Sequence, residues 1–237
     1  MAEFMYADRI PAEILAWGNE LAQIRRDIHQ HPELGFDTSR TCGVIATKLS
    51  EWGVEFDDKL VEGGVIAVVN GNAPGPTVAL RADMDALAMP DESENAWRSE
   101  TSQRCHACGH DGHQAAAIGL AKFIHANAER LCGRIRFICQ PAEEGSRGAY
   151  PILQAGVLDD VDMIICGHIA PELELGTVVA APRRLLSTTK IDFEFTGRAS
   201  HAGSHPQTGR NALLAGAAAS LAIMALPRHA DGMTRVN

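Results

Sequence analysis

The densest group of reactive side chains in the sequence lies between Cys105 and His113. These nine residues contain two thiols, three imidazoles and a carboxylate, in the order Cys-His-Ala-Cys-Gly-His-Asp-Gly-His. Thiolate and imidazole groups are preferred ligands of transition metals such as zinc. A solvated loop with incidental histidines is the alternative, but such a loop has no reason to concentrate these groups. The segment is therefore predicted to bind metal.

A structural zinc site built on Cys105 and Cys108 is a second alternative. Such sites use four protein ligands and usually combine two paired units of cysteine or histidine. No second unit of this kind follows in the sequence. We therefore favour a catalytic site with His110 as a ligand, because Cys108 lies two residues before it. His106 and His113 could equally orient the ligands.

Two adjacent carboxylates, Glu143 and Glu144, form the next chemical signal. Neighbouring carboxylates repel each other unless a cation neutralises them. With a metal ion present, one carboxylate can bind the ion while the other takes a proton from the bound water as a general base. Two solvated surface glutamates are the alternative if the pair is considered alone.

Three polar clusters directly follow apolar runs that are predicted to be strands. Asp83 and Asp85 follow the first run, the glutamate pair follows the second, and His168 follows the third. Ligands of open α/β sheets gather at the carboxyl ends of the strands, so we expect the three clusters to meet in one crevice. Considered alone, His168 would be a weak candidate, because an isolated histidine after a strand is often a satisfied buried residue.

The elements that must position these residues are predicted from hydrophobic periodicity and turn residues. Helices are expected over 11–31, 38–52, 113–131 and 147–155, with Asp111 as the N-cap of the third. Strands are expected over 64–70, 77–83, 134–140, 162–168 and 175–181. Their alternation predicts an α/β fold, with a mostly parallel mixed sheet flanked by helices.

The pattern changes between Arg183 and Ser187, where we predict a domain boundary. Residues 188–197 alternate apolar and polar side chains as a half-exposed strand does, and an apolar helix is expected over 212–227. The sequence thus divides into a catalytic domain over 1–185 and the start of a smaller α+β domain over 186–237.

Composition excludes several classes of protein. Thirty acidic and 21 basic residues give a net charge of −9 with no basic stripe, so a nucleic-acid partner is not expected. The apolar run 212–227 is shorter than the roughly 20 residues that cross a bilayer. The N-terminus resembles neither a secretion signal nor a transit peptide, which predicts a cytoplasmic protein. Six cysteines are then expected to be thiols or metal ligands.

Five segments, in this order, resemble the amidohydrolase branch of the M20 metallopeptidases. They are RRDIHQHPELGF, ALRADMDAL, HACGHDGH, PAEEGSRGA and CGHIAPELELGTV. The branch includes hippurate hydrolases, plant auxin-conjugate hydrolases and bacterial N-acyl-amino-acid hydrolases, and the stretch 188–237 is most similar to p-aminobenzoyl-glutamate hydrolases. The resemblance implies metal-dependent hydrolysis of the amide bond of an N-acyl or aroyl amino acid, such as p-aminobenzoyl-glutamate or hippurate.

The resemblance also implies roles for the residues of the catalytic domain. Cys108, His110, Glu144 and His168 would bind two divalent ions, Mn²⁺ or Zn²⁺. Glu143 would be the general base that deprotonates the attacking water and returns the proton to the leaving amine. Asp83 would orient the cluster.

For the smaller domain, the resemblance implies a lid or dimerisation role. His201 would polarise the scissile carbonyl, often in the site of a neighbouring subunit, and Arg210 and Asn211 would hold the substrate carboxylate. The protein would form a homodimer, or a heterodimer with a related subunit.

Members of the family extend beyond this stretch, complete the catalytic sheet and supply a further metal-binding histidine, for which His229 is a poor substitute. The sequence is therefore expected to be a truncated product. The alternative to an active hydrolase is a catalytically impaired fragment or a non-catalytic subunit of such an enzyme.

Overall fold

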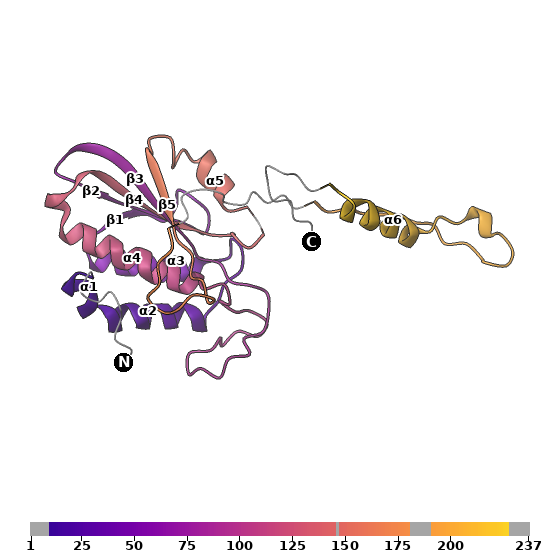
Figure 1. Cartoon of the computed structure of the whole chain (residues 1–237), viewed down its shortest axis with the longest axis horizontal. Coiled ribbons are helices and arrows are strands. Elements are labelled where there is room, and N and C mark those ends of the chain that lie inside the picture. Colours follow the sequence, from indigo (N-terminus) through magenta and orange to yellow (C-terminus); the bar gives the residue numbers. More distant parts are fainter. Residues whose placement is uncertain (1–9, 146, 181–190, 228–237) are drawn as a thin grey trace. The chain divides into compact units, whose positions relative to one another are not determined.

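A computed structural model describes residues 10–145, 147–180 and 191–227 of the chain (Figure 1). The chain divides into two compact units, Met1–Val178 and Val179–Asn237, and each is described by itself. The domain boundary expected at 183–187 and His229 lie outside the described residues.

The first unit is built on a five-stranded mixed sheet with the strand order β1-β2-β4-β3-β5. Its strands are β1 (Glu55–Asp57), β2 (Val65–Asn70), β3 (Ala73–Asp83), β4 (Cys132–Gln140) and β5 (Met163–Cys166). β3 runs parallel to both β4 and β5, whereas β2 is antiparallel to both β1 and β4. The prediction of an α/β fold with a mixed sheet is confirmed.

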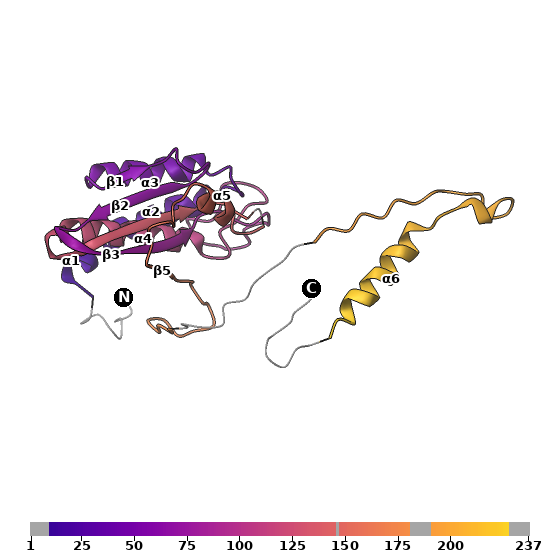
Figure 2. The same cartoon turned by 90° about the horizontal axis from the view of Figure 1, so that it is seen from above.

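Helices flank this sheet on both faces. They are α1 (Ala12–Ala16), α2 (Gly18–Gln30), α3 (Ser39–Glu51), α4 (His110–Ala126) and α5 (Ala149–Gln154), with a short 3₁₀ turn at Ala128–Arg130. Figure 1 shows α2, α3 and α4 together on one side of the sheet, and Figure 2 shows the same elements from above. α5 contributes Ile152 to a smaller cluster on the other side.

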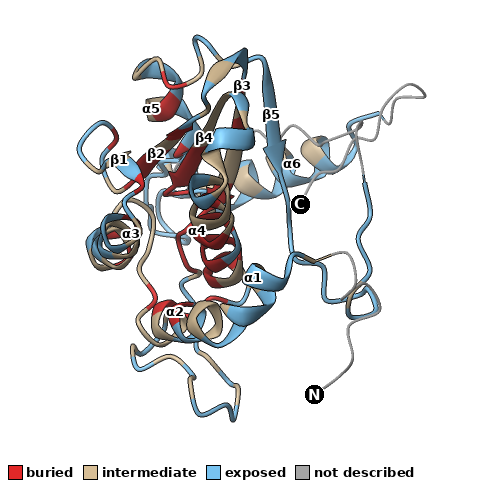
Figure 3. Ribbon diagram, turned by 90° about the vertical axis from the view of Figure 1, so that its left-hand side faces the viewer, coloured by how far each residue is buried: buried red, intermediate tan, exposed pale blue. Residues whose placement is uncertain are grey.

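Alternation along the strands explains the two cores. Val65, Ala67 and Val69 of β2 point into the larger core, whereas Ile66 belongs to the smaller one. In Figure 3, buried residues run along α4 and the strands that it covers. Because α4 packs on the sheet centre, its first turn is held firmly beside the ends of β3 and β4.

Two helix predictions need correction. The helix expected over 11–31 is interrupted at Trp17, between α1 and α2. α4 begins at His110 rather than His113, and Gly109, not Asp111, is its N-cap. Asp111 lies inside the first turn of α4, and its Oδ2 accepts hydrogen bonds from Arg25 and His29, which lie on α2.

Two strand predictions are wrong within the described residues. The part of 175–181 that is described, up to 180, contains no strand, and 191–197 is extended without a β-ladder. A strand needs a hydrogen-bonded partner, which local alternation of side chains does not supply.

The second unit contains a 3₁₀ turn, η3 (Pro206–Thr208), and helix α6 (Ala212–Met224), which agrees with the apolar helix expected there. An isolated bridge joins Arg198 and Arg210. Among the described residues, none of the helices has the length and apolar character required to cross a membrane.

Candidate metal centre

The carboxyl ends of β4, β3 and β5 lie next to one another at one edge of the sheet. Asp83, the last residue of β3, pairs with Gln140, the last residue of β4, and Cys166 at the end of β5 pairs with Arg81. The chain leaves these ends carrying the three polar clusters. Cys108 and His110 join them from the start of α4. The expected meeting of the clusters is therefore observed.

The donor atoms of the four predicted ligands lie within a few ångströms of one another. Cys108 Sγ is 3.3 Å from His168 Nε2, and His110 Nε2 is 3.7 Å from Glu144 Oε1. The ligand atoms of Cys108, His110 and His168 all lie within 4.8 Å of one another, as do those of His110, Glu143 and Glu144. Donors around a tetrahedral zinc ion are about 3.3–3.7 Å apart, so these separations suit a metal. His110 belongs to both groups.

The orientation of His110 leaves one ring nitrogen facing these donors. Its Nδ1–H donates to the backbone oxygen of Asp85 at 2.7 Å, which directs Nε2 towards the cluster. The side chain is 1% exposed, and Nε2 has no hydrogen-bond partner in the described part of the chain. A buried polar atom without a partner is costly, whereas a metal ion at this point would use its lone pair. The site therefore fits a divalent cation.

Asp85 holds the two glutamates in place. Its two carboxylate oxygens accept the backbone N–H groups of Glu143 and Glu144 at 2.8 and 3.0 Å. The residue before the pair, Ala142, has a positive φ of 56°, which is unusual for a residue with a side chain. Sequence reasoning placed Asp85 in the cluster but gave the orienting role to Asp83 alone. The Asp-x-Asp spacing at the end of this strand was the sequence feature that could have indicated an orienting role for Asp85 as well.

Asp83 acts on the other side of the cluster through His113. His113 accepts the backbone N–H of Ile169 on Nε2 at 2.9 Å, so its Nδ1–H donates to Asp83 at 2.6 Å. Its ring packs edge-on against that of His168, with the centroids 4.7 Å apart. Both nitrogens of His113 are thus committed. Of the two roles left open for this residue, the contacts favour orienting His168.

The carboxylates around Cys108 and His110 create a negative environment that favours a bound cation. Burial, together with the carboxylates of Glu144, Glu143 and Asp83, raises the pKa of Cys108 to about 12. Burial lowers the pKa of His110, but the Asp85 and Asp83 carboxylates more than offset this effect and hold it above its ordinary value. A bound divalent ion lowers both pKa values, because it favours the thiolate of Cys108 and the neutral imidazole of His110.

The carboxyl group of Asp85 should make the metal-free protein sensitive to acid. Burial raises its pKa, but hydrogen bonds from His110 and from the amides of Glu144 and Glu143 outweigh burial and lower it below its ordinary value of 3.8. The ionised form therefore stabilises the fold above this value, and the contribution is lost as the pH falls through the folded-state pKa.

We accordingly expect Asp85→Asn to destabilise the EDTA-treated protein at pH 7 by about 1–3 kcal/mol, because one backbone N–H loses its acceptor. Below about pH 4 the difference from the wild type should shrink. Urea unfolding at a series of pH values measures the loss of stability at pH 7 and its change with pH. The exposed Asp159→Asn variant is the control, and a difference that is independent of pH would contradict the assignment.

Gly109 provides the turn that brings Cys108 and His110 to the same side. Its φ is +88°, and an added Cβ would lie 3.4 Å from Ile169 Cδ1. Gly109→Ala should therefore cost about 1–2 kcal/mol of stability and weaken metal binding, because other residues adopt this conformation at a penalty. Gly43→Ala is the matched control: Gly43 lies inside α3 with open space around it, and alanine there should stabilise. Thermal unfolding distinguishes the two variants.

The remaining predicted residues lie in the second unit. His201 Nδ1 accepts the backbone N–H groups of Gly203 and Ser204, both at 3.1 Å. Arg210 exchanges backbone hydrogen bonds with Arg198. Asn211 caps α6, since its Oδ1 accepts from Leu213 and Leu214. These contacts give Asn211 a structural role and leave its amide NH₂ group as a donor.

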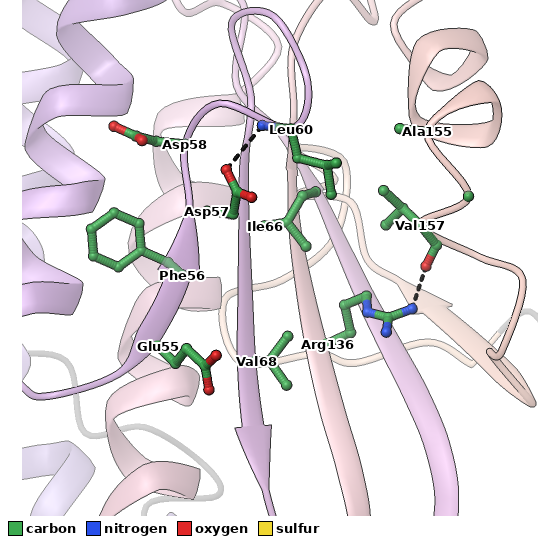
Figure 4. A pocket seen from close by; sticks show the side chains of 11 residues that line it. Glu55, Phe56, Asp57, Asp58, Leu60, Ile66, Val68, Arg136, Ala155 and Val157 are labelled. Carbon is green, nitrogen blue, oxygen red and sulfur yellow. Dashed lines mark hydrogen bonds between the residues drawn. The ribbon is translucent and has the colours of Figure 1, made fainter.

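The donor cluster does not coincide with the cavity drawn in Figure 4. That cavity, of about 440 Å³, is lined by residues of β1, β2 and β4 and by 155–157. Asp57 accepts the backbone N–H of Leu60 at its rim, and Arg136 donates to the Val157 carbonyl. No histidine or cysteine is among its lining residues, so it offers none of the soft ligands found at the strand ends.

Comparison with known proteins places these features in context. The sequence profile described as Peptidase family M20/M25/M40 matches residues 79–230. Indole-3-acetyl-aspartic acid hydrolase of Enterobacter agglomerans is 38% identical over 264 residues, which cover 92% of this chain and 61% of the relative. One of the subunits of the p-aminobenzoyl-glutamate hydrolase of Escherichia coli K12 is also 38% identical, over 99% of this chain and 56% of the relative.

A solved structure has a similar fold. The Bacillus subtilis YxeP protein, described as a dinuclear metal binding peptidase from the M20 family, is 41% identical with a TM-score of 0.65, over 67% of this chain and 45% of that one. The chain thus spans less than two thirds of the length of each of these relatives.

Proposed function

The chain belongs to peptidase family M20/M25/M40, and from this membership and the donor cluster we propose that it hydrolyses the amide bond of an N-acyl amino acid with two divalent metal ions. The observation that carries the proposal is the buried His110 Nε2. It faces Cys108 and His168 in one group of donors and Glu143 and Glu144 in the other.

Cys108, His110, Glu144 and His168 are the proposed metal ligands. Thiolate and imidazole suit zinc, whereas the carboxylates suit manganese, so either ion is compatible with the set. When bound, the ions would make a water molecule more acidic and polarise the scissile carbonyl. Asp85, Asp83 and His113 would keep the ligands oriented through the hydrogen bonds described above.

Glu143 is the proposed general base. Its side chain is more exposed than that of Glu144, while its backbone is held by Asp85. It would take the proton from the attacking water and return it to the amine that leaves. His201 would donate a hydrogen bond to the carbonyl oxygen, and Arg210 together with the amide NH₂ of Asn211 would bind the substrate carboxylate.

The proposed substrate is an aroyl or acyl amino acid. Two relatives are named for the hydrolysis of indole-3-acetyl-aspartate and p-aminobenzoyl-glutamate, each an aromatic acyl group on an acidic amino acid. We further propose assembly into a homodimer, or with a related subunit, through the second unit. A cytoplasmic location is supported by six free cysteines.

The proposal is tested by hydrolysis of p-aminobenzoyl-glutamate and hippurate, before and after treatment with EDTA, and after reloading with Mn²⁺ or Zn²⁺. We expect activity to disappear with the metal and to return on reloading, with two ions per chain by elemental analysis. Two bound ions without hydrolysis of any N-acyl amino acid would favour a non-catalytic subunit instead. Activity that survives complete metal removal would reject the mechanism.

A further inference from the structure

A second group of metal-type donors shares no residue with the first. The ligand atoms of His29, Asp91 and Cys105 all lie within 4.8 Å of one another. His29 Nε2 is 3.4 Å from Asp91 Oδ2, within the spacing of about 3.3–3.7 Å expected around a tetrahedral zinc ion. The side chains of His29 and Asp91 are 12% and 6% exposed, and Cys105 is buried. The three donors are therefore close together and largely shielded from water.

Each of the polar donors is already held in a binding orientation. Asp111 accepts a hydrogen bond from His29 Nδ1 at 2.9 Å, which leaves Nε2 to face Asp91. A carboxylate paired with the far nitrogen of a histidine is the usual arrangement behind a zinc-bound imidazole. Asp91 is fixed by the backbone N–H groups of Ser93 and Ser99, at 2.9 and 2.8 Å. Little reorganisation is needed for these two side chains to bind an ion.

His106 lies beside this group without belonging to it. It is 3% exposed, and neither of its ring nitrogens has a hydrogen-bond partner among the described residues. Its ring centroid lies 6.2 Å from that of His29. A buried imidazole with two unsatisfied nitrogens is costly, so this corner of the domain contains a polar group that the metal-free fold does not satisfy.

The position of the group gives a metal ion a structural task. Residues 84–109 contain no helix and no strand beyond the isolated bridges Leu34–Ala86 and Leu87–Cys105. Loops longer than roughly 12–15 residues without secondary structure are uncommon in compact domains unless they are functional. Asp91 and Cys105 belong to this loop, while His29 belongs to α2. An ion bound by all three would fasten the loop to the helix next to the first turn of α4.

From these contacts we propose a structural site for a divalent transition metal such as zinc, bound by His29, Asp91 and Cys105. A protonated His29 bridging Asp91 and Asp111 explains the two ion pairs. Those ion pairs alone do not explain why the buried Cys105 thiol lies against the same two side chains, His29 and Asp91. A bound metal ion accounts for all three.

Cobalt is a suitable probe, because Co²⁺ bound to a thiolate gives a sulfur-to-metal charge-transfer absorption in the near ultraviolet. The Cys108→Ser variant removes the thiol of the first cluster, so any such band then reports another cysteine. We expect one equivalent of Co²⁺ to produce the band in Cys108→Ser and in Cys108→Ser/Cys132→Ser, in which an exposed cysteine is also replaced. Cys105→Ser/Cys108→Ser should lose it.

A folded Cys108→Ser protein without the band would overturn the proposal, and so would a band that persists in Cys105→Ser/Cys108→Ser. If Cys105→Ser/Cys108→Ser does not fold, the Co²⁺ affinity of Asp111→Asn in the Cys108→Ser background is measured instead. Its Co²⁺ affinity should be about 10- to 100-fold weaker, and an unchanged affinity would also reject the site. None of these readouts depends on hydrolysis, so they are independent of the proposed activity.

Discussion

Replacing Glu143 by glutamine is expected to lower kcat for amide hydrolysis by roughly 10²- to 10⁴-fold, the usual contribution of a general base. Glutamine keeps the size of the side chain and leaves the backbone N–H bond to Asp85 intact, but it cannot take a proton from water. The metal content should stay at two ions per chain, because Glu143 is not among the proposed ligands. Steady-state kinetics and elemental analysis on the same preparation measure the two effects.

Glu144→Gln is the matched control for this result. The two residues are adjacent and their backbones are held by the same carboxylate, so both substitutions disturb the loop alike. Glu144→Gln should lose metal, whereas Glu143→Gln should lose activity without losing metal. An unchanged kcat in Glu143→Gln would remove it from the role of base, and a reversed pattern would exchange the two roles.

His110→Ala should have the largest effect on metal binding, with the affinity for one of the ions lowered by more than the roughly 10- to 100-fold typical of residues behind the ligands. His110 belongs both to the group formed with Cys108 and His168 and to the group formed with the two glutamates. Its Nε2 has one lone pair and binds one ion, so removing the imidazole takes a ligand from that ion, opens the space between the two groups and frees the Asp85 carbonyl. Activity should fall with the metal content and should not recover when moderate excess Mn²⁺ or Zn²⁺ is added.

His125→Ala provides the control for this variant, since His125 is an exposed residue in the last turn of the same helix. Isothermal titration of metal-free protein with Zn²⁺ compares the two. If His110→Ala binds both ions at wild-type affinity, His110 is not a ligand. In that case Cys108, Glu144 and His168 would be the remaining ligands of the first unit.

The two orienting carboxylates explain why so many polar groups crowd this sheet edge. Asp85 supports the glutamate loop and Asp83 supports His168 through His113, so each carboxylate fixes a different strand end. The donors of a metal site must be held to a fraction of an ångström, and buried hydrogen bonds provide that restraint. The dense Cys-His-Asp segment thus contains supporting groups as well as the predicted ligands.

Much of the architecture could be predicted from local sequence. The strands β2, β3, β4 and β5 and the helix α3 follow from side-chain periodicity and turn residues, which act within a few residues. The proximity of Glu144 and His168 to Cys108 could also be predicted, because the carboxyl ends of parallel strands lie at one edge of a sheet. The strands expected at 175–181 and 188–197 did not form in the described residues, since periodicity says nothing about a partner.

Only the tertiary structure shows which polar groups are proposed metal ligands and which orient those ligands through hydrogen bonds. The residue types of Asp83, Asp85 and His113 indicate that they belong to a site. Which nitrogen of His113 is protonated, however, depends on the backbone N–H of Ile169, 56 residues away. His29 reaches Asp111 across 82 residues in the same way. Sequence determined the kinds of ligand and the strand ends that carry them, because these depend on local chemistry. The packing of α2 on α4, and of α4 against the sheet, determined the pairings, because they join side chains that are distant along the chain.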